Sequence, residues 1–118
     1  MKFCKKTDII KRNNADNCVV SEYPTNDQDL DFAIVRVDGR YPETGFAVNR
    51  EVKEIVYIGE GSGLVFVENQ RIELNQGDVI LINPGELFYW EGHYTLHIAC
   101  NPAFTPEQHQ HVNDTEQV

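Results

Sequence analysis

Residues 51–100 decide the fold, and they read EVKEIVYIGEGSGLVFVENQRIELNQGDVILINPGELFYWEGHYTLHIAC. Short runs rich in Val, Ile, Leu and aromatic residues alternate here with clusters of Gly, Asn and Pro, a pattern typical of strands separated by turns. No window of this stretch places its apolar residues at helical spacing. The stretch therefore predicts an all-β sandwich or barrel, with strands at 51–58, 64–68, 71–74, 78–82, 86–90 and 94–100.

The strand pattern continues toward the N-terminus of the chain. Residues 30–37 read as a strand that ends at the turn dipeptide Asp38-Gly39, and residues 18–23 read as a short edge strand. After Pro102 the alternation of apolar and polar residues stops. We therefore expect one domain with frayed ends, divided into an N-terminal segment (1–29), a barrel (30–103) and a polar C-terminal tail (104–118).

Composition excludes several classes of protein. The 118 residues include 10 Lys and Arg against 19 Asp and Glu, a formal net charge of −9, which disfavours binding to nucleic acid or to anionic membrane surfaces. No apolar run approaches the roughly 20 residues of a membrane span, and the N-terminus has no signal-peptide core. The three cysteines are an odd number without a CxxC motif, so we expect reduced thiols and a cytoplasmic location.

The glycine-rich segment Gly59-Glu60-Gly61-Ser62-Gly63 has two interpretations. It resembles a phosphate-binding loop, but such a loop is followed by a helix, and here a strand-like run follows. A hairpin turn is the favoured interpretation.

The histidines are the next candidates for a functional site. Alternation along 94–100 places Leu96 and Ile98 on one face of a strand and His97 on the other. His97 is therefore either a hydrogen-bonded interior residue or an acid, base or ligand in a pocket. His109 and His111 share one side of an extended segment, but they lie in the polar tail without a third ligand, so we expect them to be solvated.

Aromatic and arginine side chains offer further candidates. Tyr89 and Trp90, with Phe88 before them, form either ordinary packing or the wall of a pocket. Arg40 follows the Asp38-Gly39 turn, and it is either a surface residue or a clamp for a carboxylate.

The stretch from Gly45 to Pro102 resembles the cupin family on its glycines and their spacing. Glu54 is followed by a strand and by Gly61 at the spacing of the first cupin motif. In the second motif, Gly77 and Gly85 match the two glycines, Asn83-Pro84 falls at the proline, and Phe88 and Gly92 fall at the positions of the histidine and the asparagine. The resemblance implies an all-β, single-domain jelly-roll barrel of the double-stranded β-helix type.

The same resemblance implies that the usual cupin metal site is lost. Metal-binding cupins use three histidines and a glutamate, and their positions fall on Ala47, Asn49, Glu54 and Phe88 in this sequence. Only the glutamate is an ordinary ligand for a transition metal. We therefore predict neither a metal site nor another cofactor.

The resemblance also turns Glu54 into the barrel, and alternation then places Val56 and Ile58 inside with it. A carboxyl group buried without a metal needs a partner, such as Asn49, Tyr41, His97 or an arginine, or its pKa rises through desolvation. The predicted catalytic pair is Glu54 and His97, acting as general acid and base. The predicted ligand-binding residues are Asn49, Tyr41, Tyr57, Phe88, Tyr89, Trp90 and Arg40.

The sequence thus favours a metal-independent cupin that binds a small sugar-like or acidic molecule in its barrel, with enzymatic activity left open. Two alternatives remain. One is a metal-dependent dioxygenase or isomerase with a displaced site, and the other is a non-catalytic interaction module. In each case we expect a homodimer that binds neither nucleic acid nor membranes.

Overall fold

The computed structural model describes residues 1–113 of the chain. These residues form nine β-strands and two short 3-10 turns, so the all-β prediction is confirmed. The elements are η1 Lys6–Asp8, β1 Ile10–Ala15, β2 Cys18–Tyr23, β3 Asp31–Tyr41, β4 Phe46–Asn49, β5 Lys53–Val67, β6 Gln70–Asn75, β7 Val79–Ile82, β8 Leu87–Asn101, η2 Pro106–Gln108 and β9 His109–Val112. Within residues 1–113, no helix has the length and apolar character to cross a membrane.

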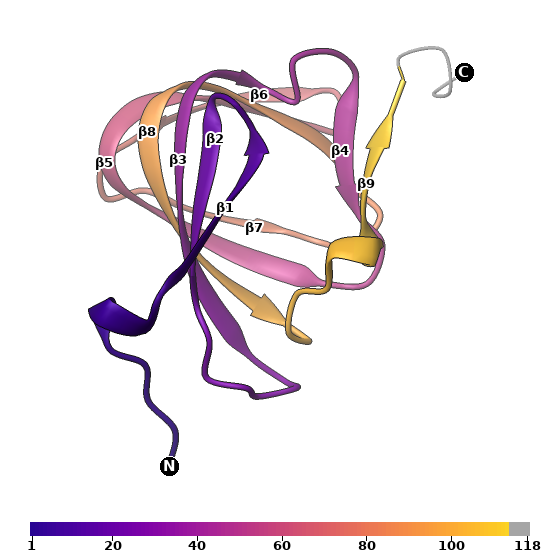
Figure 1. Cartoon of the computed structure of the whole chain (residues 1–118). Helices are drawn as coiled ribbons and strands as arrows, with labels where there is room; N and C mark the ends of the chain where they lie inside the picture. The colour runs from indigo at the N-terminus through magenta and orange to yellow at the C-terminus, as the bar shows by residue number, and fades with distance from the viewer. Residues whose placement is uncertain (114–118) are drawn as a thin grey trace.

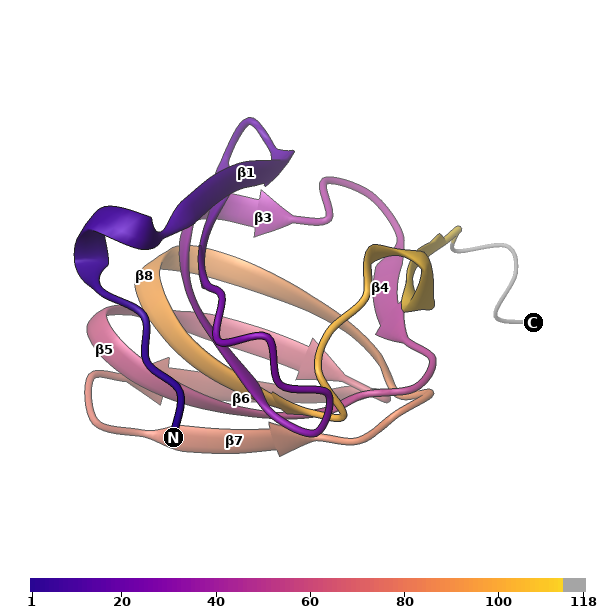
Figure 2. The same cartoon turned by 60° about the horizontal axis from the view of Figure 1, so that its bottom comes forward.

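The strands form one antiparallel sheet that curls around an interior (Figure 1). Its main path runs β1-β2-β3-β8-β4-β9, and β5 lies beside β8 along almost its whole length. The other edge of β5 pairs with β7 and then with β6. In the turned view, β1 and β3 lie above β5, β6 and β7, while β4 stands at one end (Figure 2). The curled sheet therefore encloses an interior between its two layers of strands.

A row of glycines crosses three neighbouring strands. Gly39 of β3 lies opposite Gly92 of β8, which lies opposite Gly63 of β5. The turns predicted at Asp38-Gly39, at residues 59–63 and at Gly92 do not form, because the strands continue through all three places. A Cβ atom on Gly92 would lie 2.5 Å from the Cα atom of Gly63, so glycine allows the two backbones to approach. The glycines mark bends within long strands.

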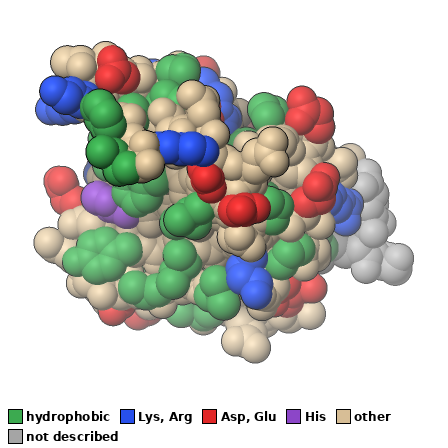
Figure 3. Space-filling view, turned by 90° about the horizontal axis from the view of Figure 1, so that it is seen from below, with side chains coloured by type: hydrophobic (Ala, Val, Ile, Leu, Met, Phe, Trp, Pro, Cys, Tyr) green, Lys and Arg blue, Asp and Glu red, His purple; other side chains and the backbone are tan. Residues whose placement is uncertain are grey.

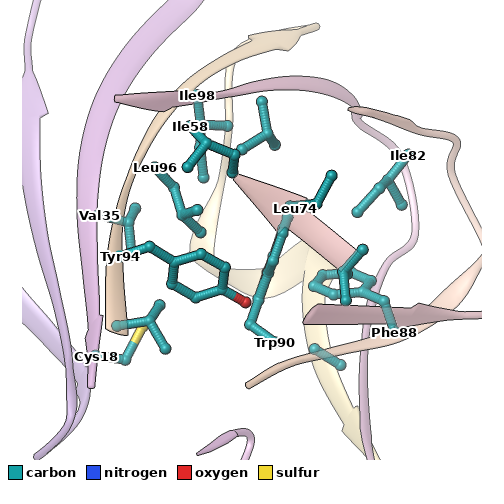
Figure 4. Packing of buried hydrophobic residues seen from close by; sticks show 14 of the residues in the cluster. Cys18, Val35, Ile58, Leu74, Ile82, Phe88, Trp90, Tyr94, Leu96 and Ile98 are labelled. Atoms are coloured by element: carbon teal, nitrogen blue, oxygen red, sulfur yellow. The ribbon is translucent and has the colours of Figure 1, made fainter. Parts of the chain in front are cut away.

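Alternation within the long strands builds the core. On β5, Val56 and Ile58 are fully buried together with Glu54, whereas Ile55 and Tyr57 face outward, which confirms the predicted facing of this strand. Figure 4 shows the surrounding cluster of buried side chains, including Val35, Leu96, Ile98, Trp90 and Tyr94.

The two ends of the chain differ from the predicted domain division. Strand β1 pairs with β2, so residues 18–23 form a strand as predicted but do not form the edge of the sheet. The segment predicted as a polar tail, 104–118, contains η2 and β9, and β9 pairs with β4. Residues 109–112 alternate too briefly for a periodic signal, so only their pairing with β4 reveals the strand. The rest of the predicted tail, residues 114–118, lies outside the described residues.

Candidate functional site

A cavity of about 70 Å³ opens into the barrel between the two ends of the curled sheet. One ordered water needs roughly 10–15 Å³ when volume is measured in this way, so several waters or a small organic group fit. Its lining combines apolar and polar side chains. The lining residues are Arg12, Asn14, Cys18, Val20, Glu22, Asp31, Ala33, Val35, Tyr41, Asn49, Glu54, Phe88, Trp90, Leu96, Ile98, Cys100, Phe104 and His109.

Glu54 is the most deeply buried carboxyl group of this cavity, with 6% of its surface exposed. Burial raises its pKa from 4.5 to about 7, a hydrogen bond from Asn49 opposes that rise, and the nearby charge of Asp31 adds to it. The free energy of placing a charge in a low-dielectric interior is the physical cause of the increase. Glu54 therefore exchanges its proton near neutral pH.

Asn49 holds the polar wall of the cavity together. Its side-chain oxygen accepts hydrogen bonds from Gln108 Nε2 at 3.0 Å and from His109 Nδ1 at 2.8 Å. The side-chain oxygen of Gln108 in turn accepts from the backbone N–H groups of Glu51 and Val52, at 3.1 and 3.2 Å. The segment that carries Gln108 and His109 is thereby anchored to the β4–β5 connection.

His109 connects this amide to the hydroxyl group of Tyr41. Because Asn49 Oδ1 only accepts, the network assigns the proton of the neutral imidazole to Nδ1. His109 Nε2 is then the acceptor for the Tyr41 hydroxyl group, 2.8 Å away. Burial, together with the charge of Arg12, lowers the pKa of His109 from 6.5 to about 4, so the ring is neutral at physiological pH.

Arg12, on the first strand, supplies the cationic side chain of the cavity lining. Its Nε atom donates to a Glu22 carboxylate oxygen at 2.7 Å, and its Nη1 atom donates to Asn14. Its guanidinium carbon lies 5.1 Å from the centre of the Phe104 ring. Both the charge and the planar face of Arg12 are therefore already engaged by the protein.

Asp31 provides a second carboxyl group near Glu54. One of its oxygens accepts the backbone N–H of Phe104 at 2.8 Å. Burial is the largest cause of a raised pKa for Asp31, and the neighbouring charge of Glu22 contributes to it. Burial likewise raises the pKa of the Cys100 thiol, so this cysteine stays protonated.

The structure brings five of the predicted site residues together and leaves four outside. Asn49, Glu54, Tyr41, Phe88 and Trp90 all line the cavity.

His97 does not reach Glu54. Leu96 and Ile98 occupy the inward positions of β8, so His97 points to the outer face, where its ring lies 5.9 Å from that of Tyr57. The predicted catalytic pair of Glu54 and His97 is therefore wrong. The histidine that lines the cavity with Glu54 is His109.

Tyr57, Tyr89 and Arg40 also lie elsewhere. Tyr57 is on the outer face of β5. Tyr89 stacks on Phe66 at 5.2 Å and lies beneath Arg40, whose guanidinium carbon is 3.9 Å from the ring centre. Arg40 donates to three backbone carbonyl groups in the β3–β4 connection, so it shapes this loop and clamps no carboxylate.

Sequence reasoning missed Arg12, Asp31 and His109. Arg12 lies on a polar strand that has no apolar alternation, so hydrophobic periodicity carries no signal for it. For His109, the HxH pattern of residues 109–111 was a sign of a strand that presents both histidines on one side, since alternate residues of a strand point to the same face.

The lining residues do not fit a divalent cation. Ala47 and Phe88, which lie opposite each other on β4 and β8, have no ligand atoms. The Asn49 oxygen already accepts two N–H groups, so Glu54 is the one ordinary ligand at the four positions that metal-binding cupins use. Among residues 1–113, no group of three His, Cys, Asp or Glu side chains is arranged to hold a metal ion.

Comparison with solved structures supports the barrel assignment. Pac13 from Streptomyces, a nucleoside dehydratase seen with uridine, superimposes with a TM-score of 0.82 over 93% of this chain and 89% of its own, at 16% identity. KdgF from Halomonas sp. gives a TM-score of 0.71 over 91% and 98%, at 14% identity. An RmlC-like cupin from Shewanella frigidimarina gives 0.71 over 86% and 90%, at 17% identity. At identities this low, the structural likeness shows a shared fold alone.

Sequence comparison is more specific about the family. Among curated proteins, no sequence matches this chain. The sequence profile of the AraC-like ligand binding domain matches residues 31–95, more than half of the chain. These residues include the glycine row and the Glu54 strand. The chain therefore belongs to the family of AraC-like ligand-binding domains, and its fold is the jelly-roll barrel of the cupins.

Proposed function

We propose that the barrel cavity binds a small polar organic molecule without a metal ion. The observation that carries this proposal is the combination of an apolar wall, which includes Phe88 and Trp90, with the convergent polar groups of Tyr41, Asn49 and Glu54. This is the composition of small-molecule sites in proteins. The structural likeness to a nucleoside dehydratase seen with uridine supports a ligand with sugar-like hydroxyl groups.

Of the two ligand classes suggested by the sequence, the contacts favour the sugar-like one over the acidic one. Tyr41, Asn49 and Glu54 are hydrogen-bonding partners suited to hydroxyl groups. Arg12 is the cation that an acidic ligand would need, but its charge is already balanced by Glu22 at 2.7 Å. An acidic ligand would have to break this ion pair.

A hydroxyl deletion in the cavity tests this binding. We expect Tyr41→Phe to weaken the binding of a ligand found by thermal-shift screening of monosaccharides and nucleosides by roughly three- to tenfold, because one hydrogen bond is lost. Isothermal titration calorimetry provides the measurement. Tyr57→Phe, which removes the same hydroxyl group from the outer face, serves as the control and is expected to leave the affinity unchanged. If no compound raises the melting temperature, or if the two variants lose affinity equally, the proposal is wrong.

The same cavity supports acid–base catalysis as a second candidate function. Glu54, with a pKa of about 7, both accepts and releases a proton at neutral pH. The Tyr41–His109 pair provides another proton donor and acceptor on the same wall. NMR spectra of the bound compounds over time distinguish this function from binding alone, since only catalysis changes the compound.

We also propose that the protein is a homodimer formed through the outer face of the sheet. Five large apolar side chains on β3, β5 and β7 are between 40% and 55% exposed, namely Phe32, Ile55, Tyr57, Val79 and Leu81. Ile55 lies opposite Leu81 and Tyr57 lies opposite Val79, while the His97 ring lies between Phe32 and Tyr57, with ring centres 6.3 and 5.9 Å away. Figure 3 shows hydrophobic side chains gathered on this side of the molecule.

A second copy of the chain fits this face best. Monomeric proteins rarely expose contiguous apolar patches larger than a few hundred Å². Two identical apolar faces are complementary under two-fold symmetry, and uncharged contacts avoid the repulsion between two chains of net charge −9.

We expect Leu81→Glu to convert this dimer to a monomer, because a two-fold interface would bury the new carboxylates of both copies, two negative charges without partners. Light scattering after size exclusion would then report the single-chain mass of 13.5 kDa instead of twice that value. Glu73→Lys, an exposed charge change on β6, is the control and should leave the mass unchanged. A monomeric wild-type protein at about 100 μM would contradict the proposal, since stable homodimers bind more tightly than this.

The proposed location is the cytoplasm. Cys4, Cys18 and Cys100 are all free thiols in the described chain, and two of them are buried. Free thiols are typical of proteins from reducing compartments.

A further inference from the structure

The charges that line the cavity are unbalanced toward the negative. Glu22, Asp31 and Glu54 contribute carboxyl groups, whereas Arg12 contributes a single guanidinium group. Arg12 forms an ion pair with Glu22, and the charges of these two side chains cancel. His109 adds no positive charge at neutral pH, because burial lowers its pKa to about 4. Asp31 and Glu54 are therefore left without compensation from the protein.

The contacts of these two acids confirm that their partners are neutral. Among residues 1–113, neither carboxyl group has a lysine, arginine or histidine nitrogen within 4.0 Å. Glu54 receives a hydrogen bond from the Asn49 amide, and Asp31 receives one from the Phe104 backbone. Neutral donors satisfy oxygen atoms but leave the charge uncompensated, so the cavity attracts a cation.

The apolar part of the lining suits an organic cation rather than a metal ion. The rings of Tyr41, Phe88, Trp90 and Phe104 line the same cavity, and Phe88 and Trp90 meet edge to face with centres 6.1 Å apart. Aromatic faces attract ammonium groups, most strongly where the contact is shielded from water. Among residues 1–113, no three His, Cys, Asp or Glu side chains are grouped so that they could hold a metal ion.

We propose that the ligand of this cavity carries a protonated amino group, which faces Glu54 and Asp31 and contacts the aromatic wall. This inference rests on the proposed function, namely that a small molecule binds in the barrel. It refines the ligand class, because hydroxyl groups beside the amino group, as in an amino sugar, match Tyr41 and Asn49. It excludes an acid without an amino group.

The proposal predicts that binding depends on pH. The titratable or charged groups around Glu54 are Asp31 and Tyr41 on β3, Cys100 on β8, His109 on β9, and Arg12, Cys18 and Glu22 on β1 and β2. Of these, Cys18, Cys100 and Tyr41 stay protonated and neutral at pH 6–8, because burial raises the pKa of each. An ammonium group favours the ionised form of Glu54, so affinity should rise between about pH 6 and pH 8 as this proton is lost.

Three probes with one ring and different charges test the proposal, namely cyclohexylamine, cyclohexanol and cyclohexanecarboxylate. At about pH 8 we expect the ammonium compound to bind the wild-type protein at least about tenfold more tightly than the alcohol, and the carboxylate to bind most weakly. Titration calorimetry measures each affinity, and repetition at about pH 6 should reduce the preference for the amine.

Two neutralising variants locate the effect. Glu54→Gln should lower the affinity for cyclohexylamine about tenfold and change that for cyclohexanol less than twofold. Asp31→Asn provides an independent test if the first variant does not fold, and Glu73→Gln on the surface is the control. Equal binding of amine and alcohol would overturn this inference but support ligand binding in the barrel. Failure of all three probes to bind would overturn both proposals.

Discussion

Glu54→Gln should make the folded protein more stable at about pH 8, by roughly 3 kcal/mol, and should have little effect near pH 4. The pKa of Glu54 rises from 4.5 to about 7 on folding, chiefly because the side chain is buried. Between these two values the folded state holds a proton that the unfolded chain has released. Stability therefore falls as pH rises through this window, and the amide of glutamine removes the loss.

His109 has the opposite dependence on pH. Its pKa falls from 6.5 to about 4 on folding, so the unfolded chain binds a proton that the folded protein does not. The stability contribution of His109 is therefore lost as pH falls through this window. In the wild-type protein the contributions of Glu54 and His109 oppose each other between about pH 4.5 and pH 6.5. In the Glu54→Gln variant, only the loss of stability at acid pH that comes from His109 remains.

Urea unfolding at several pH values, followed by circular dichroism, measures both effects. The variant should gain stability from about pH 4 to pH 6.5 and then level off, whereas the wild-type curve should fall above about pH 6.5. Glu73→Gln, on the exposed face of β6, is expected to follow the wild-type curve. Parallel curves for wild type and Glu54→Gln would show that Glu54 does not titrate in the barrel near neutral pH.

Gly92→Ala should prevent stable folding, with an expected loss above roughly 3 kcal/mol. The added Cβ atom would lie 2.5 Å from the Cα atom of Gly63 and 2.7 Å from the carbonyl oxygen of Ser62. Both of these are backbone atoms of the paired strand β5, so no side-chain rotation relieves the clash. Separating β5 from β8 would disrupt the longest strand pairing of the barrel.

Gly77→Ala is the matched control for this prediction. Gly77 also has a positive φ, of 95°, but no atom lies within 4 Å of the position of its Cβ. Alanine there should cost about 1 kcal/mol, for backbone conformation alone. Circular dichroism and urea unfolding of both variants separate the two causes. Similar losses in the two proteins would mean that the close approach of β5 and β8 is not what requires glycine at residue 92.

The short strands of the barrel were predictable because their side chains alternate and their ends carry turn residues. Strand β2 matches its predicted range of 18–23, and β6 and β7 differ from theirs by a residue at one or both ends. The prediction divided β5 and β8 in two and ended β3 early at Gly39, since glycine indicates a turn in the sequence whether the chain reverses there or merely bends. Only the pairing of Gly92 with Gly63 distinguishes these cases.

The candidate site was predictable where a side chain followed the alternation of an apolar strand. Glu54 has this property, because it shares a face with Val56 and Ile58. Arg12 and His109 come from short polar strands whose inward direction is set by pairing with distant parts of the chain. The local sequence pattern therefore predicted the inward position of Glu54 but not those of Arg12 and His109.

The division of the cavity between the middle and the ends of the chain has a consequence for how such domains diversify. Ten of the eighteen lining residues lie outside the family-matched stretch 31–95, and seven of these ten belong to the end segments and not to β8, including Arg12 on β1 and His109 on β9. The two end segments pack onto a barrel whose long strands pair independently of them. Substitutions in these segments can therefore change which molecule is recognised while the barrel is retained. Ligand selectivity and the barrel fold can thus evolve separately.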